Sequence, residues 1–254
     1  MSIAILAALL AAVSGTPRAA AVSTPDDAAP AASAASGVDP AVAARRAANA
    51  AQRHVAAMLI RTHQPQAAID RILDPLIAAE DAQNADRTET LYCANTPTET
   101  LYYMLQAARD KKNAVALDGT LCNALFMRGF AQIDLGRIPA AEADYARTVA
   151  LSPSNAHYLS EMGELQSRKH DWAAALTWFH RAETASEFAA PERVKAEQGR
   201  ALRGIGYVDV ELGKFDEAEA AYRRCLEIDP RDQKAQAELG YVLGLKAKQA
   251  APSK

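Results

Sequence analysis

The chain has 254 residues, of which 50% are hydrophobic, 6% aromatic and 23% charged, and its formal net charge is -3 at pH 7. This length is enough for one large domain or two small ones. Alanine is abundant, and because alanine is depleted in β-sheets, the composition favours closely packed helices and argues against an all-β fold. The lack of excess positive charge argues against nucleic-acid binding, which requires cations to neutralise phosphates.

The first residues have the pattern of a secretory signal. An uninterrupted apolar run from Ile3 to Val13 precedes small residues, which predicts a signal peptide over residues 1–21 with cleavage after Ala21. The run is too short to be a stable membrane span. No Lys or Arg precedes it, so a disordered alanine-rich tail and a misassigned start codon are alternatives. Residues 22–38 are rich in Ala, Ser and Pro and are predicted to form a disordered linker.

Residues 39–121 are predicted to form a diverged helical region. Asp39 can cap a first helix, over residues 40–62, whose first turn holds a proline. Apolar residues at helical spacing predict a second helix over 66–79. A polar stretch over 81–96 follows, and a further helix is expected from Thr98 to about Lys111.

The second half of the chain contains an internal repeat, whose units start at Cys122, Ala156, Gly199 and Gln233. Their spacings are 34, 43 and 34 residues, so extra residues lie between the second and third units. Two segments align without gaps over two glycines, an alanine, a tyrosine and a proline. These residues are Gly129, Gly136, Ala141, Tyr145 and Pro153 in the first segment, and Gly206, Gly213, Ala218, Tyr222 and Pro230 in the second. A copy between them keeps Gly163, Ala175 and Phe179, and a fourth copy begins with Gly240.

This pattern resembles the tetratricopeptide repeat, a helix-turn-helix unit, over residues 122–254. The resemblance implies an all-α solenoid of stacked helical hairpins that ends in a C-terminal capping helix over Gln233 to about Ala250. The small glycine and alanine are expected where the two helices of one hairpin cross, and the aromatic residue is expected to face the next hairpin. The proline stops the second helix, because it excludes the preceding residue from the helical region.

The resemblance also implies where a partner would bind. In such arrays the first helix of each hairpin, called here the A helix, lines a concave groove that holds a ligand. Carried over by repeat position, the candidate groove residues are Phe126, Phe130, His157, Glu161, Glu164, Arg168, Arg200, Arg203, Tyr207 and Tyr241. Aromatic side chains mixed with both signs of charge suit an extended peptide or a partner helix.

Two features limit this interpretation of the groove. Phe130, Tyr207 and Tyr241 occupy the same repeat position, and the alternative is that they only contact the neighbouring A helix. Family members that grip an acidic C-terminal tail use asparagines at the positions held here by Phe130 and Glu161. That specific activity is therefore not expected.

The chain has three cysteines. Cys225 falls at a small buried position of its repeat and is interpreted as a core residue. Cys93 and Cys122 remain as a possible disulfide if the chain is exported. In the chain-entropy model, that bond would stabilise the fold by roughly 3.5 kcal/mol.

No catalytic, metal-binding or cofactor-binding motif is present, and the five histidines lack the spacings of zinc sites. The sequence predicts a non-catalytic periplasmic or secreted adaptor for a protein or peptide, and its alanine richness suggests a bacterial source. One alternative is a structural module that forms homo-oligomers through its N-terminal helices. Another is an accessory subunit of an envelope enzyme complex. The partner's identity and the oligomeric state stay open.

Overall fold

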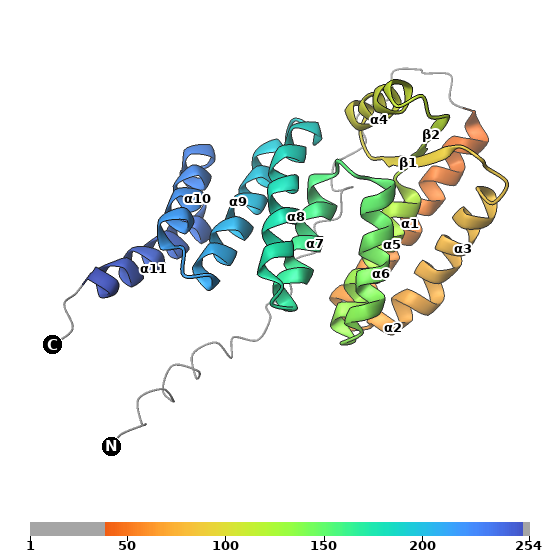
Figure 1. Ribbon diagram of the computed structural model, residues 1–254. Helices are drawn as coiled ribbons and strands as arrows, with labels where there is room; N and C mark the ends of the chain where they lie inside the picture. Colours follow the sequence, from red (N-terminus) through yellow and green to blue (C-terminus); the bar gives the residue numbers. More distant parts are fainter. Residues whose placement is uncertain (1–38, 251–254) are drawn as a thin grey trace.

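A computed structural model describes residues 39–250 and shows helices arranged side by side in a row (Figure 1). The predicted signal peptide over 1–21 and the linker over 22–38 lie outside the described residues. Within the part of the chain that the structure describes, no helix is both long and apolar enough to cross a membrane.

The row begins with a helical pair near the predicted positions. Helix α1 spans Pro40–Arg61 and is capped by Asp39, whose carboxylate accepts a hydrogen bond from the amide of Ala41 at 2.9 Å. The second helix is made of α2 (Pro65–Ala68), a π-helical turn (Ile69–Leu73) and α3 (Asp74–Gln83). Residues such as Leu73 and Leu76 are buried, so the helix is held by its apolar face.

A small β-α-β unit follows, so the region over residues 39–121, which was predicted to be helical apart from a polar stretch over 81–96, also contains a two-stranded sheet. Strand β1 (Thr90–Ala94) and strand β2 (Ala114–Asp118) pair in parallel, with α4 (Pro97–Arg109) as their connection. The register aligns the first residues of the two strands with each other, and likewise their last residues. Such short strands have little local signal, because their backbone hydrogen bonds depend on a partner distant in sequence.

Within the described residues, three helical hairpins and a terminal helix complete the row (Figure 1). The hairpins are α5 (Thr120–Asp134) with α6 (Ile138–Leu151), α7 (Ala156–Arg168) with α8 (Trp172–Ala185), and α9 (Val194–Glu211) with α10 (Phe215–Ile228). A short 3-10 turn, Ser186–Phe188, precedes α9. Helix α11 spans Gln233–Ala250, as the prediction of a terminal helix requires.

In each of the three hairpins, a glycine of the first helix packs against an aromatic ring of the second helix. A Cβ added at Gly129 would lie 2.5 Å from the ring of Tyr145, and one at Gly206 would lie 2.7 Å from the ring of Tyr222. The aromatic residue therefore packs on the glycine of its own hairpin, a contact that the sequence analysis did not assign to it. Phe179 also faces the next hairpin, because its ring is close both to Gly163 of its own hairpin and to Gly204 of the following one.

Candidate partner-binding site

Helices α7 and α9 bring four of the candidate groove residues together. Arg200 on α9 binds Glu161 on α7 with a nitrogen–oxygen distance of 2.9 Å, and it lies 3.8 Å from Glu164. His157 begins the same row on α7. Burial, and then the negative charge of Glu161, raise the pKa of Glu164. The structure therefore brings together, between neighbouring A helices, four residues that repeat position assigned to the groove, and their binding of a partner stays a prediction.

Glu197 is the centre of this cluster, and the sequence analysis did not identify it. Its side chain is buried, and one oxygen accepts a hydrogen bond from Arg193 at 2.6 Å. The other oxygen lies 3.7 Å from Nδ1 of His157 and 3.8 Å from Nε of Arg200. Burial alone would raise the pKa of Glu197, but the attraction of His157, Arg193 and Arg200 outweighs it and lowers the pKa to about 2.

Two cavities flank the first half of α9. The first, of 180 Å³, lies between the loop after β1 and the first turns of α7 and α9, and His157 and Glu197 are among its lining residues. The second, of 590 Å³, is lined by Arg200 and Arg203 and by the loop after α10. In that second cavity Arg203 forms an ion pair with Asp232. The candidate residues on this part of α9 thus line hollows, and their charges are already paired within the chain.

The aromatic candidates differ in how accessible they are. Tyr207 on α9 is 45% exposed and Tyr241 on α11 is 56% exposed. Tyr207 makes one edge-to-face contact, with Trp172 at 6.2 Å between ring centroids. Phe130 is partly buried against the core, which agrees with the alternative that this position contacts neighbouring helices.

Phe126 must be removed from the candidate surface. It is buried in the core, and its ring packs against Tyr145, His157 and Tyr158. The repeat position placed it on the groove, but the following A helix covers it. Arg168, by contrast, is exposed at the end of α7.

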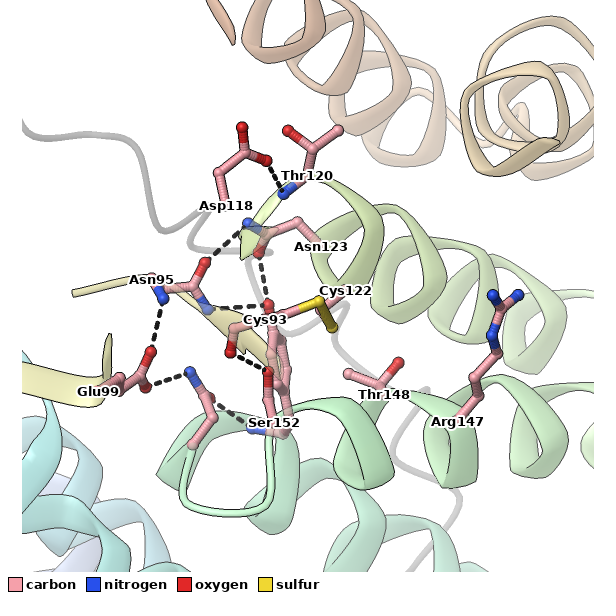
Figure 2. The surroundings of a disulfide bond; sticks show 12 residues. Cys93, Asn95, Glu99, Asp118, Thr120, Cys122, Asn123, Arg147, Thr148 and Ser152 are labelled. Carbon is pink, nitrogen blue, oxygen red and sulfur yellow. Dashed lines mark hydrogen bonds between the residues drawn. A yellow bond between two sulfur atoms is a disulfide. The ribbon is translucent and has the colours of Figure 1, made fainter. Parts of the chain in front are cut away.

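A disulfide and a network of amide side chains join the β-α-β unit to the hairpins (Figure 2). Cys93 on β1 is bonded to Cys122 on α5, and the hydroxyl of Ser152 donates to the carbonyl of Cys93 at 2.8 Å. Asn95 accepts from Asn123 at 3.1 Å and donates to the hydroxyl of Tyr158 at 3.3 Å. The loop that closes the smaller cavity is therefore fixed to both α5 and α7.

Glu99 on α4 completes this junction. One of its oxygens accepts from the backbone amide of Asn95 at 2.6 Å, and the other accepts from the side chain of Asn155 at 2.9 Å (Figure 2). Burial raises the pKa of Glu99, although these hydrogen bonds oppose the shift. Sequence reasoning did not find this residue either, because α4 lies outside the recognised repeats.

Among residues 39–250, no three or more His, Cys, Asp or Glu side chains lie together in a way that could hold a metal ion. Free Cys225 is buried, and burial raises the pKa of its thiol to about 11. Its sulfur lies 3.5 Å from the carbonyl of Gly199 in the core of the third hairpin. This agrees with the interpretation of Cys225 as a core residue.

Comparisons with known proteins agree with this geometry. A family profile described as tetratricopeptide repeat matches residues 154–231, whereas no curated protein matches the chain. PilF of Pseudomonas aeruginosa is a similar solved structure, with 13% identity over 81% of this chain and 72% of that chain and a TM-score of 0.55. At this identity the likeness concerns the fold alone.

Two further solved structures are similar at lower TM-scores. The first tetratricopeptide domain of Spaghetti (RPAP3), bound to an HSP90 peptide, has 21% identity over 52% of this chain and 99% of that one, with a TM-score of 0.45. MamA from Desulfovibrio magneticus RS-1 has 16% identity over 78% of this chain and 85% of that one, with a TM-score of 0.46. The profile match and the stacked hairpins together show that the chain contains tetratricopeptide repeats, over residues 154–231, within a solenoid of helical hairpins.

Proposed function

We propose that the chain is a non-catalytic, exported adaptor that binds a protein or peptide along its A helices. The observation that carries this proposal is the exposure of Tyr207 and Tyr241, which hold the same repeat position on successive A helices, α9 and α11. Tyrosine and arginine supply much of the binding energy at protein interfaces. Arg203, which lines the 590 Å³ cavity, lies on the same helix as Tyr207.

Crosslinking tests this proposal. A photoreactive amino acid at Tyr207 is expected to capture a partner in living cells, and Tyr241→Ala is expected to reduce that capture at least fivefold. The matched control places the same amino acid at Thr184, an exposed position on α8 in a B helix, the second helix of a hairpin. Equal capture at the two positions, or capture unaffected by Tyr241→Ala, contradicts binding along the A helices.

Export is part of the proposal and has two supports. The first is the apolar run that predicts a signal peptide over residues 1–21. The second is the disulfide between Cys93 and Cys122, since such bonds persist in oxidising compartments and are rare in the cytosol. Both supports favour a periplasmic or secreted protein.

A second candidate function is self-association through the N-terminal region. Leu101 and Leu105 lie one turn apart on α4, and each is 61% exposed. Contiguous exposed apolar surface is where proteins associate, and this pair would contribute to such a surface. If two copies pair there, the double substitution Leu101→Glu and Leu105→Glu is expected to convert a dimer into a monomer in light scattering. A monomeric unsubstituted protein at high concentration contradicts this candidate.

A further inference from the structure

The smaller cavity contains buried polar atoms that have no hydrogen-bond partner. His157 is 9% exposed and Glu197 is 3% exposed, and both line the cavity. Neither ring nitrogen of His157 has a hydrogen-bond partner, and Oε2 of Glu197 also lacks one. Buried polar groups are nearly always hydrogen-bonded, and an unsatisfied one costs about 1–3 kcal/mol. The cavity therefore presents buried polar atoms without hydrogen bonds to any group that enters it.

The charges of the lining favour a cation. Three carboxylates, those of Glu99, Glu192 and Glu197, line the cavity, against the single guanidinium of Arg193. That guanidinium is already bound to the other oxygen of Glu197 at 2.6 Å. An incoming carboxylate would therefore meet like charges. A cation would find Oε2 of Glu197, which has no hydrogen bond and only the longer contacts with His157 and Arg200, at 3.7 and 3.8 Å.

The size of the cavity restricts what this cation can be. At 180 Å³ it is smaller than the ~300–1,000 Å³ of ordinary small-molecule pockets, so it fits a single side chain or a chain end. A primary ammonium group is compact and carries three hydrogen-bond donors. Those donors match Oε2 of Glu197 and a ring nitrogen of His157, neither of which has a hydrogen-bond partner.

We infer that this cavity binds the primary ammonium group of a partner peptide. The group can come from a lysine side chain or from a free N-terminus, since both present the same chemistry. The inference rests on the proposed function, because it assigns the part of the peptide that is held at the α7–α9 end of the site. The loop after β1, fixed by the Asn95 contacts, forms the opposite wall.

Titration of the full, oxidised chain with two small amines tests the inference. Butylammonium represents a lysine side chain, and alaninamide represents an N-terminus. Their neutral counterparts, butyramide and N-acetylalaninamide, are the controls. We expect saturable shifts of the His157 ring signals in NMR spectra with at least one amine and none with the neutral compounds. The tighter amine then identifies the source of the ammonium group.

Matched carboxylate variants make this test specific. Glu197→Gln keeps the shape of the side chain but removes its charge, and we expect it to weaken amine binding at least tenfold. Glu192→Gln makes the same change of charge at an exposed position on the rim and is expected to weaken binding less than threefold. If Glu197→Gln does not fold, His157→Gln, which keeps a polar side chain, is used and is expected to weaken binding as strongly.

The two proposals fail in distinguishable ways. Absence of saturable amine binding, or equal binding of amines and neutral amides, overturns the ammonium site. Equal effects of Glu197→Gln and Glu192→Gln also overturn it, because only overall charge would then matter. Amine binding without capture at Tyr207 counts against the adaptor proposal and leaves the ammonium site supported. Capture at Tyr207 without amine binding supports the adaptor proposal and overturns the ammonium site.

Discussion

Gly204→Ala is expected to lower the free energy of unfolding by about 2 kcal/mol, although alanine is the better helix former. An added Cβ at Gly204 would overlap the ring of Phe179. That ring has little room to move away, because it also packs closely on its own hairpin's Gly163, where an added Cβ would lie 2.9 Å from it. Phe179 is buried, so a displaced ring would disturb the contact between the second and third hairpins.

Gly240→Ala is the matched control and is expected to have the opposite sign. Gly240 also lies inside a helix, α11, but a Cβ added there meets nothing within 4 Å. Alanine should therefore stabilise the protein by about 0.5–1 kcal/mol through helix propensity alone. Urea unfolding of both variants measures the difference. Equal effects of the two substitutions would show that the Phe179 ring does not join the hairpins.

A double-mutant cycle can assign the cost of Gly204→Ala to that ring. Phe179→Leu should itself destabilise the protein, because it removes buried volume. In the Phe179→Leu background, however, Gly204→Ala should cost less than it does in the original protein, because the clash is relieved. Residues in contact typically show such coupling energies, of about 0.5–3 kcal/mol. An additive cycle would contradict the packing described here.

The repeat architecture was predictable because its determinants are local and periodic. A glycine and an aromatic ring must meet inside every hairpin, so Gly129 with Tyr145 and Gly206 with Tyr222 recur at the same spacing. The terminal helix α11 was found for the same reason. Its register continues the repeat, and its bounds in the structure are Gln233–Ala250.

The β-α-β unit was not predictable in the same way. Strands β1 and β2 are five residues each, and a whole helix separates them in sequence. Their pairing is supported by contacts that no short-range pattern reports, such as the stacking of Tyr92 on Tyr103 with ring centroids 5.0 Å apart. The polar residues around β1 instead gave the pattern of a loop.

The candidate site was predictable only where it coincides with repeat positions. His157, Glu161 and Arg200 do coincide with them, and the structure brings them together. Glu197 does not, because it belongs to the extra residues between the second and third repeats. Burial also could not be inferred from position, and this is why Phe126 was placed on the surface while it lies in the core.

Removing the disulfide with Cys93→Ser and Cys122→Ser is expected to lower the free energy of unfolding by roughly 3.5 kcal/mol. The bond joins β1 to α5 across a sequence separation of 29 residues, so its loss frees a long loop in the unfolded chain. Urea unfolding with and without reductant measures this effect. A reductant should destabilise the original protein and leave the double variant unchanged, which separates the bond from the substitutions themselves.

Thiol counting connects this bond to the proposed export. Protein alkylated during extraction from cells, then unfolded, should show one reactive thiol, that of Cys225, and three after reduction. A chain that lacks residues 1–21 should stay in the reducing cytosol and show three thiols without reduction. Three thiols in both chains would contradict export and the bond in cells. One thiol in both would separate the bond from export, because it would then form without the predicted signal peptide.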